Sequence, residues 1–314
     1  MIHLQLRVPP ACVDDVMTLL REQDSVTNVA VLKDAYVKPD GTLVVCDVAR
    51  EAANEVVSLL RGLRLHHEGS IMLTEPETLL SDEATRVEET APGRPDDGLV
   101  WDAVENRVRR ESEMSFAYLA FLTLAVLLAG AGRLLDQPIL IVGAMVVGPE
   151  FSPIAAICVG LARPRLTLVP TATRTLVLGY VLAIAVAVPF WWITHLIGHA
   201  GSGDVARGPL TDFIVQPNGW SFVVALMAGV AGTLALTTAK SGPLVGVFIS
   251  VTTVPAAGTV ALCIGTGVWH EVLPALAQLV VNLSGMIMAG TLTLLGQRAY
   301  WRRKGGTVAH EVHG

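Results

Sequence analysis

The sequence predicts an α-helical polytopic membrane protein with a small α+β domain in front of it. Hydrophobic residues make up 52% of the chain and charged residues only 16%, whereas soluble domains carry about 25% charge. Residues 1–114 hold 22 acidic and 12 basic side chains, and residues 115–314 hold 6 acidic and 10 basic ones. The front half is therefore acidic and water-soluble in character, and the back half is apolar. The net charge of −6 argues against nucleic-acid binding, which needs a basic face.

The expected domain boundaries follow these shifts in composition. They are a cytoplasmic domain at residues 1–74, a linker at 75–98, a juxtamembrane helix at 99–114, a membrane domain at 115–297 and a cytoplasmic tail at 298–314. The first residues lack the basic and apolar regions of a secretory signal, so we expect the front domain to stay in the cytoplasm.

The first 74 residues predict a β-α-β-β-α-β unit. Ile2–Val8 alternates apolar and polar residues, which is the period of a half-buried strand. The same reading predicts helices at 13–20 and 51–63 and further strands at 26–37, 42–48 and 70–73. This order is that of ferredoxin-like domains, which host many unrelated functions. The domain shows no phosphate loop, nucleophile motif or metal triad. We therefore expect no catalytic residue, cofactor or metal there, and assign it a regulatory or assembly role.

Two segments connect this unit to the membrane domain. Residues 75–98 carry three prolines, two glycines and acidic runs without an apolar period, which predicts a linker. Residues 99–114 regain helical spacing through three valines one turn apart. Trp101 beside these valines and the arginines at 107, 109 and 110 are typical of a helix at the lipid surface.

Six apolar stretches are long enough to cross a bilayer, which takes about 20 residues. They are Phe116–Gly132, Pro138–Gly160, Thr175–Ile197, Trp220–Ala239, Pro243–Val268 and Val272–Gly296. With the N-terminus inside, eleven Lys and Arg residues lie on inner loops and flanks, and only Arg133 and Arg207 lie on outer loops. This positive-inside bias predicts a multi-pass protein of the cell (inner) membrane with both termini in the cytoplasm.

The second and fifth spans are predicted to be interrupted. Pro149 and Pro153 lie at the centre of span two, Gly143 and Gly148 precede them, and Pro255 lies at the centre of span five. Proline lacks the amide proton and clashes with the preceding turn, so both helices should break or kink near mid-membrane. Three spans per half give the second half the opposite orientation. Inverted repeats with broken central helices are typical of transporters with a midplane site, whereas tighter packing alone is the alternative.

Polar residues near these interruptions are the candidate solute or ion ligands. A charged Glu150 at that depth would cost about 2.5–3.5 kcal/mol, so a neutral carboxyl or one paired with a cation is expected. The structural alternative is a neutral Glu150 bonded to carbonyls that the break frees. Nearby polar candidates are Ser152, Ser250, Thr252, Thr253 and Asn282. Arg174 and Lys240 are candidates for drawing an anion toward the cytoplasmic side, with snorkelling to the interface as the alternative.

The segment Val142–Ile154 reads Val-Gly-Ala-Met-Val-Val-Gly-Pro-Glu-Phe-Ser-Pro-Ile and resembles a prokaryotic family catalogued as domain of unknown function 389. The stretch Leu244–Ala257 and the pair Val281-Asn282 are similar to its later blocks. The resemblance implies the fold and a membrane location, including a small α+β domain before the membrane part. It implies no settled activity.

Three functional hypotheses follow. The first is a transporter- or channel-like protein for a small solute or ion, embedded in the lipid bilayer as a homo-oligomer. The alternative is a membrane-anchored sensor or scaffold whose cytoplasmic domain binds a ligand or partner. An intramembrane enzyme is disfavoured, because the chain has no HExxH or GxSxG motif and no pair of membrane carboxylates. The four cysteines show neither metal nor redox spacing.

Overall fold

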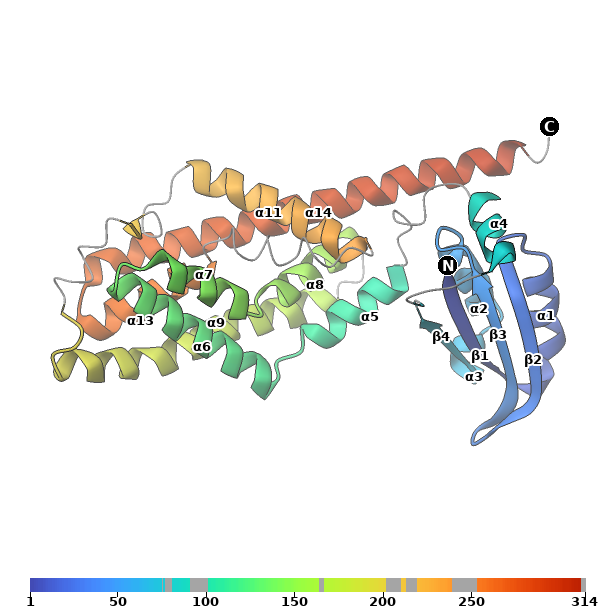
Figure 1. Cartoon of the computed structure of the whole chain (residues 1–314), viewed down its shortest axis with the longest axis horizontal. Coiled ribbons are helices and arrows are strands. Elements are labelled where there is room, and N and C mark those ends of the chain that lie inside the picture. Colours follow the sequence, from blue (N-terminus) through green and yellow to red (C-terminus); the bar gives the residue numbers. More distant parts are fainter. Residues whose placement is uncertain are drawn as a thin grey trace. The chain divides into compact units, whose positions relative to one another are not determined.

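The computed structural model describes residues 1–74, 76, 81–90, 101–163, 167–201, 210–212, 219–238 and 253–311. These residues form two compact units. The first is built around Met1–Val104, and the second around Glu105–Leu236 with the C-terminal helices. Figure 1 labels the helices and strands of both.

The first unit contains a four-stranded antiparallel sheet. Its strands are β1 (Ile2–Val8), β2 (Val26–Val37), β3 (Asp40–Val48) and β4 (Ser70–Thr74), in the spatial order β2-β3-β1-β4 (Figure 1). Strand β1 is central and pairs antiparallel with β3 on one side and with β4 on the other. The four strands predicted from the sequence are confirmed, with bounds that differ by at most two residues.

Helices cover one face of this sheet and close its core. They are η1 (Pro10–Cys12), α1 (Val13–Arg21), α2 (Ala53–Gly62) and α3 (Leu65–Glu68). The alternating residues Ile2, Leu4, Leu6 and Val8 of β1 are fully buried, as the period of two predicts, and pack with side chains of α1 and α2. Burying each of these side chains contributes about 1.5–3 kcal/mol, so this alternation fixes which face of β1 meets the helices.

The segment predicted as a linker contains a helix, α4 (Asp82–Thr90). Ala84 and Val87 lie one turn apart on α4 and are both buried, and α4 packs near β2. Ser81 begins the helix, because its Oγ accepts a hydrogen bond from the backbone N–H of Ala84 at 3.2 Å. Two buried residues are too few to produce a visible apolar period, which is why the sequence did not indicate this helix.

The thiol of Cys46 on β3 is predicted to be chemically inert. Burial, and then the charge of Asp47, raise the pKa of the Cys46 thiol to about 12. Because the thiolate is the reactive form, Cys46 should react with iodoacetamide at pH 8 at least about tenfold more slowly than the partly exposed Cys12. Peptide mass spectrometry of the labelled full-length protein measures both rates, and denaturant should equalise them. Equal rates in the folded protein would contradict this prediction.

The second unit is a bundle of mostly apolar helices. It contains α5 (Trp101–Glu111), α6 (Phe116–Leu134), α7 (Pro138–Val147), α8 (Phe151–Ala162), α9 (Leu168–Leu196), α11 (Gly219–Thr237), α13 (Thr253–Thr266) and α14 (Trp269–Glu311). Within the described part of the chain, α6, α9, α11 and residues Trp269–Tyr300 of α14 are long and apolar enough to cross a membrane. The bent pair of α7 and α8 makes a fifth candidate. The length and apolar composition of these helices indicate a helical membrane protein.

Three helices differ from their expected bounds. Helix α9 begins at Leu168, seven residues before the predicted start of span three. Helix α14 is continuous for 43 residues, so the segment 298–311, expected as a tail, extends the last helix. Residues 243–252, the first part of the predicted span five, lie outside the described residues, and α13 is its described remainder.

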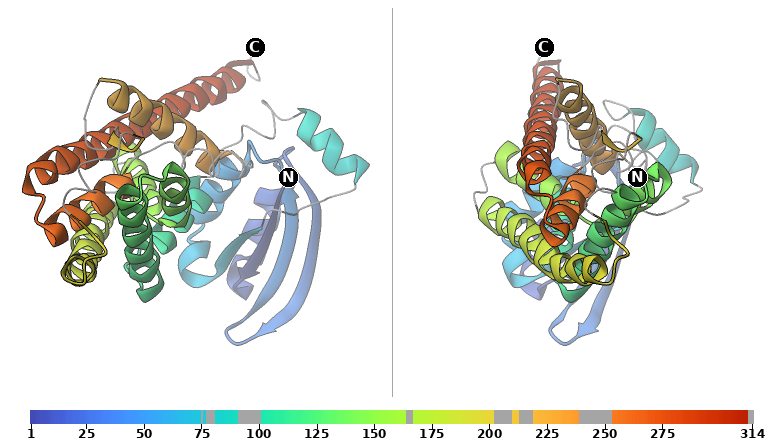
Figure 2. Two further views of the ribbon diagram at one scale, coloured as in Figure 1. Left: turned by 60° about the vertical axis from the view of Figure 1, so that its left-hand side comes forward. Right: turned by 90° about the vertical axis from the view of Figure 1, so that its left-hand side faces the viewer.

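Small residues allow the helices of this unit to approach closely. A Cβ on Gly229 of α11 would lie 2.6 Å from Met286 O of α14, and one on Gly285 would lie 2.9 Å from Ala225 Cβ. Both glycines belong to the small-xxx-small pattern of the sequence, which is typical of close membrane-helix contacts. Helices α11 and α14 accordingly lie side by side (Figure 2).

Helix α5 confirms the helical spacing that the sequence predicted for this segment, and its position at the lipid surface stays a prediction. Trp101 is 8% exposed and Val108 is fully buried. Two of its arginines make ion pairs. Arg107 bonds Glu111 at 3.0 Å, and the buried carboxylate of Glu105 lies between Arg109 at 3.7 Å and Arg163 at 3.3 Å.

Candidate functional site

The predicted interruption of span two is confirmed. Helix α7 ends at Val147, helix α8 begins at Phe151, and the two axes are bent by 54°. Pro149 has no N–H to donate to the carbonyl of Met145 and favours an extended conformation in the residue before it. Gly148 adopts that conformation, with ψ of 129°, while its own N–H still bonds Ala144 O at 3.1 Å. The break therefore follows from the Gly148-Pro149 pair.

The other two prolines begin helices. Pro153 is the third residue of α8, and Pro255 is the third residue of α13. The first turn of a helix tolerates proline, because its N–H groups have no partner within the helix. Pro255 lies in the first turn of α13, two residues after its start, and the residues before Thr253 lie outside the described part of the chain, so the interruption of span five stays a prediction.

The two helix starts meet through one hydrogen bond. Thr253 Oγ1, from the first residue of α13, donates to Glu150 Oε1, from the residue before α8, at 3.0 Å. Glu150 is 4% exposed and Thr253 is 1% exposed. The second carboxyl oxygen, Glu150 Oε2, is buried without a hydrogen-bond partner. A Cβ on Gly148 would overlap Glu150 Oε2 and Val254, so only glycine leaves room for this carboxyl position.

Two tyrosines complete the surroundings of Glu150, and the sequence analysis missed both. Tyr118 comes from α6 and Tyr180 from α9, and both hydroxyl groups are buried without a well-formed hydrogen bond. The charge of Glu150 acts on both hydroxyls, and Tyr180 also faces Thr253. We call Tyr118, Glu150, Tyr180 and Thr253 the carboxyl–hydroxyl cluster. A phenol in an otherwise apolar span was the signal available in the sequence, because a buried tyrosine hydroxyl needs a partner.

The cluster lies nearer to one end of α6 than to its middle. Tyr118 is in the first turn of α6, where its backbone N–H donates to Ser115 Oγ at 3.0 Å. Ser152, next to the break, donates to Glu111 Oε2 of α5 at 3.3 Å. Ser152 therefore contacts a charged residue that precedes α6, instead of joining the cluster. The break therefore lies toward the α5 end of the bundle, and its expected mid-membrane depth stays a prediction.

The remaining predicted residues lie outside the cluster or outside the description. Gly143 lies within α7, where a Cβ would meet only Leu128 Cδ2 at 3.6 Å. Asn282 is buried within α14, and Arg174 is exposed on α9. Ser250, Thr252 and Lys240 lie outside the described residues.

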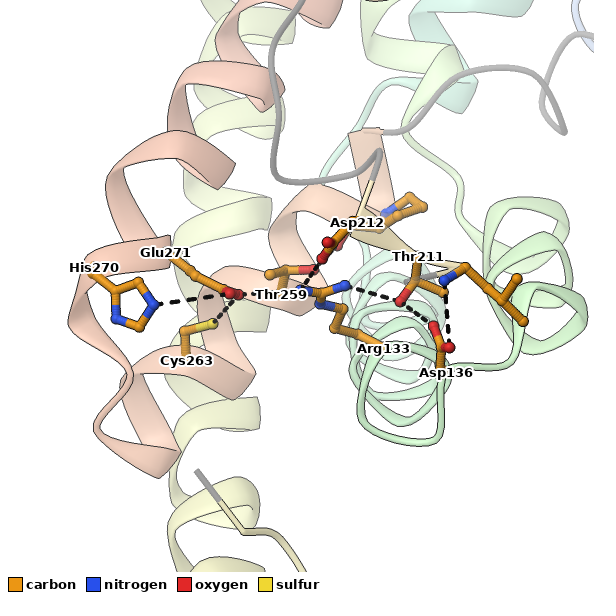
Figure 3. Close-up of polar contacts among 10 residues, drawn as sticks. Arg133, Asp136, Thr211, Asp212, Thr259, Cys263, His270 and Glu271 are labelled. Atoms are coloured by element: carbon orange, nitrogen blue, oxygen red, sulfur yellow. Dashed lines mark hydrogen bonds and ion pairs between the residues drawn. The ribbon is translucent and has the colours of Figure 1, made fainter. Parts of the chain in front are cut away.

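A second polar cluster surrounds the buried side chain of Arg133 (Figure 3). Arg133, in the last turn of α6, donates to Thr211 Oγ1 and Asp212 Oδ1 at 2.9 Å each and to Glu271 Oε2 of α14 at 3.4 Å. Thr211 in turn donates to Asp136 Oδ1 at 2.9 Å. Glu271 Oε2 also accepts from the Cys263 thiol of α13 at 3.8 Å.

The sequence predicted Arg133 in an outer loop and indicated no role for it. Three of the six acidic residues after position 114 are in this network, namely Asp136, Asp212 and Glu271. That concentration of carboxylates opposite one arginine was the available signal. We call the residues of this network the arginine cluster: Arg133, Asp136, Thr211, Asp212, Cys263 and Glu271. It joins α6, residues 210–212, α13 and α14 at the end of α6 opposite to Tyr118.

These features define a helical membrane protein built around an interrupted span. Residues 145–288 match the model of the family described as Domain of unknown function (DUF389). An uncharacterized protein of Methanocaldococcus jannaschii is 21% identical over 277 residues, which cover 86% of this chain and 82% of that protein. The chain is similar to the DUF389 family over this segment, which includes both helix starts of the carboxyl–hydroxyl cluster. No solved structure matches it.

Proposed function

We propose that the protein is a transporter- or channel-like protein for a small solute or ion, and that the carboxyl–hydroxyl cluster is its binding site. One observation carries the proposal. A buried carboxyl oxygen without a hydrogen-bond partner, Glu150 Oε2, lies at the interruption between α7 and α8. The other oxygen of this carboxyl, Oε1, accepts a hydrogen bond from Thr253 at the start of α13.

The energetics support a binding role over a purely structural one. An unpaired buried polar group costs about 1–3 kcal/mol, and a charged one costs more. Irregular backbone at membrane depth is tolerated where it is buried in protein or lines a water-filled cavity. Three buried polar atoms without partners at one break, on Glu150, Tyr118 and Tyr180, are best explained by a species that fits between them.

The finer architecture belongs to the same proposal. We infer six spans in two inverted sets of three, with both termini on the cytoplasmic side of the cell membrane. The strand order β2-β3-β1-β4 supports a ferredoxin-like domain in a regulatory or assembly role. Solute movement needs no covalent chemistry, so we infer that the protein is not an enzyme, and that it acts as a homo-oligomer.

Glu150→Gln tests this proposal in liposomes that contain the purified full-length protein. Flux of protons, sodium, potassium, chloride and a neutral sugar is compared with that of empty liposomes. The wild type should exceed the empty liposomes for at least one solute, and Glu150→Gln should reduce that flux by about tenfold or more, because the amide cannot carry the charge. Glu113→Gln makes the same chemical change on an exposed side chain and should keep wild-type flux. Equal flux in wild type and Glu150→Gln, or no wild-type flux, would contradict the proposal.

A further inference from the structure

We propose that the carboxyl–hydroxyl cluster binds one monovalent metal cation of the sodium type. This inference rests on the proposed function, because it names the ligand class of the same site. The cluster offers only oxygen atoms: the carboxyl of Glu150, the hydroxyl of Thr253, and the phenols of Tyr118 and Tyr180. Hard cations are bound by oxygen ligands of these kinds.

The hydrogen-bond arrangement leaves the oxygen lone pairs available. Thr253 donates its proton to Glu150 Oε1, so its oxygen keeps two lone pairs, which can accept from Tyr180 or coordinate a cation. Glu150 Oε2 and the two phenol oxygens have no hydrogen-bond partner, although all three residues are at least nine-tenths buried. A cation within reach of these oxygens would satisfy Glu150 Oε2 and the phenols of Tyr118 and Tyr180. The carbonyl of Met145, which loses its helical donor to Pro149, is a backbone oxygen at the same break.

The charge of the cluster selects a monovalent ion. Glu150 is its one carboxylate, and the side chains that face it in the cluster, Thr253, Tyr118 and Tyr180, are hydroxyl-bearing and carry no positive charge. One positive charge therefore neutralises the site. A divalent ion would leave a net charge in an apolar environment, and calcium sites usually have several carboxylates. An anion would meet the Glu150 carboxylate directly, so this charge disfavours it.

The test is equilibrium binding of radioactive sodium to the purified full-length protein in detergent, with no solute added. The wild type should bind sodium saturably, at about one ion per chain, and calcium should compete poorly. Tyr180→Phe keeps the ring and removes one oxygen, so it should weaken binding about threefold to tenfold. Glu150→Gln removes the charge and should weaken binding at least tenfold. Tyr300→Phe, on an exposed side chain of α14, is the matched control and should bind as the wild type does.

The outcomes separate this inference from the proposed function. Absence of saturable sodium binding by the wild type, or unchanged binding in both Tyr180→Phe and Glu150→Gln, overturns the cation and leaves water as the species in the cluster. If Glu150→Gln does not fold, the sodium affinity of Tyr180→Phe is compared with that of Tyr300→Phe. Equal affinities would then overturn the inference. Flux of a solute without sodium binding would sink this inference and spare the proposed function. Sodium binding without flux of any solute would contradict the proposed function and leave this inference standing.

Discussion

Replacing Arg133 with methionine is expected to lower the stability of the protein by about 3 kcal/mol. The arginine is fully buried, and its removal leaves the carboxylate of Glu271, which is 14% exposed, with the exposed ring of His270 at 4.0 Å in place of a buried cation. Breaking a buried ion pair from one side costs about 3–5 kcal/mol, because the remaining charge stays in an apolar environment. Asp212 is 46% exposed and can be solvated, which places the expected loss at the low end of that range.

The measurement is the midpoint of thermal unfolding in detergent, followed by tryptophan fluorescence, which should fall by about 6–12 °C. Arg107→Met is the matched control. Its pair with Glu111 is half exposed at both ends, and such pairs contribute at most about 1 kcal/mol. Adding Glu271→Gln to Arg133→Met should restore part of the loss, since it removes the stranded charge. A midpoint for Arg133→Met equal to that of Arg107→Met would show that the arginine cluster does not stabilise the bundle.

The sequence predicted those features that depend on neighbours along the chain. The alternation of Ile2, Leu4, Leu6 and Val8 needed only a period of two, because one face of β1 meets a core and the other does not. The break between α7 and α8 needed only the chemistry of Gly148 and Pro149. In both cases the physical cause lies within a few residues, so the pattern in the sequence predicts the structure.

The sequence could not predict the partners of the site residues, because contacts between helices are not set by a local period. Thr253 and Glu150 are 103 positions apart, and several other hydroxyl residues near the breaks fitted the same description. Tyr118 and Tyr180 join them only through the packing of α6 and α9, where a Cβ on Gly179 would lie 2.8 Å from the ring of Tyr118.

The polar neighbours of α8 are a further feature that the sequence did not indicate. Counting residues placed Glu150 at the centre of an apolar stretch, which predicts a position at mid-depth. Helix α8 also contacts the charged helix α5, through Ser152 with Glu111 and Arg163 with Glu105. Apolar length alone does not reveal such a neighbour, because the contact joins segments that are far apart in the sequence.

Replacing Gly258 with valine is expected to separate α6 from α13 and lower the unfolding midpoint by about 5–10 °C. A Cβ at position 258 would lie 2.6 Å from Ala129 Cβ and 2.8 Å from Gly130 N and Val126 O. Two of these atoms are backbone, so the side chain has nothing flexible to displace and the helices must move apart. Overpacking of this kind costs about 1–3 kcal/mol, and a branched residue is at the upper end.

Gly143→Ala on α7 is the control, because its Cβ would make only an ordinary contact with Leu128 and should leave the midpoint within about 1 °C. Helix α6 carries Tyr118 and Arg133 about 22 Å apart, and α13 carries Thr253 and Cys263 about 15 Å apart. The contact at Gly258 therefore holds together the two helices that reach both polar clusters. Gly258→Val should reduce flux as well as stability; a variant with a lowered midpoint and wild-type flux would show that the two clusters work independently of this contact.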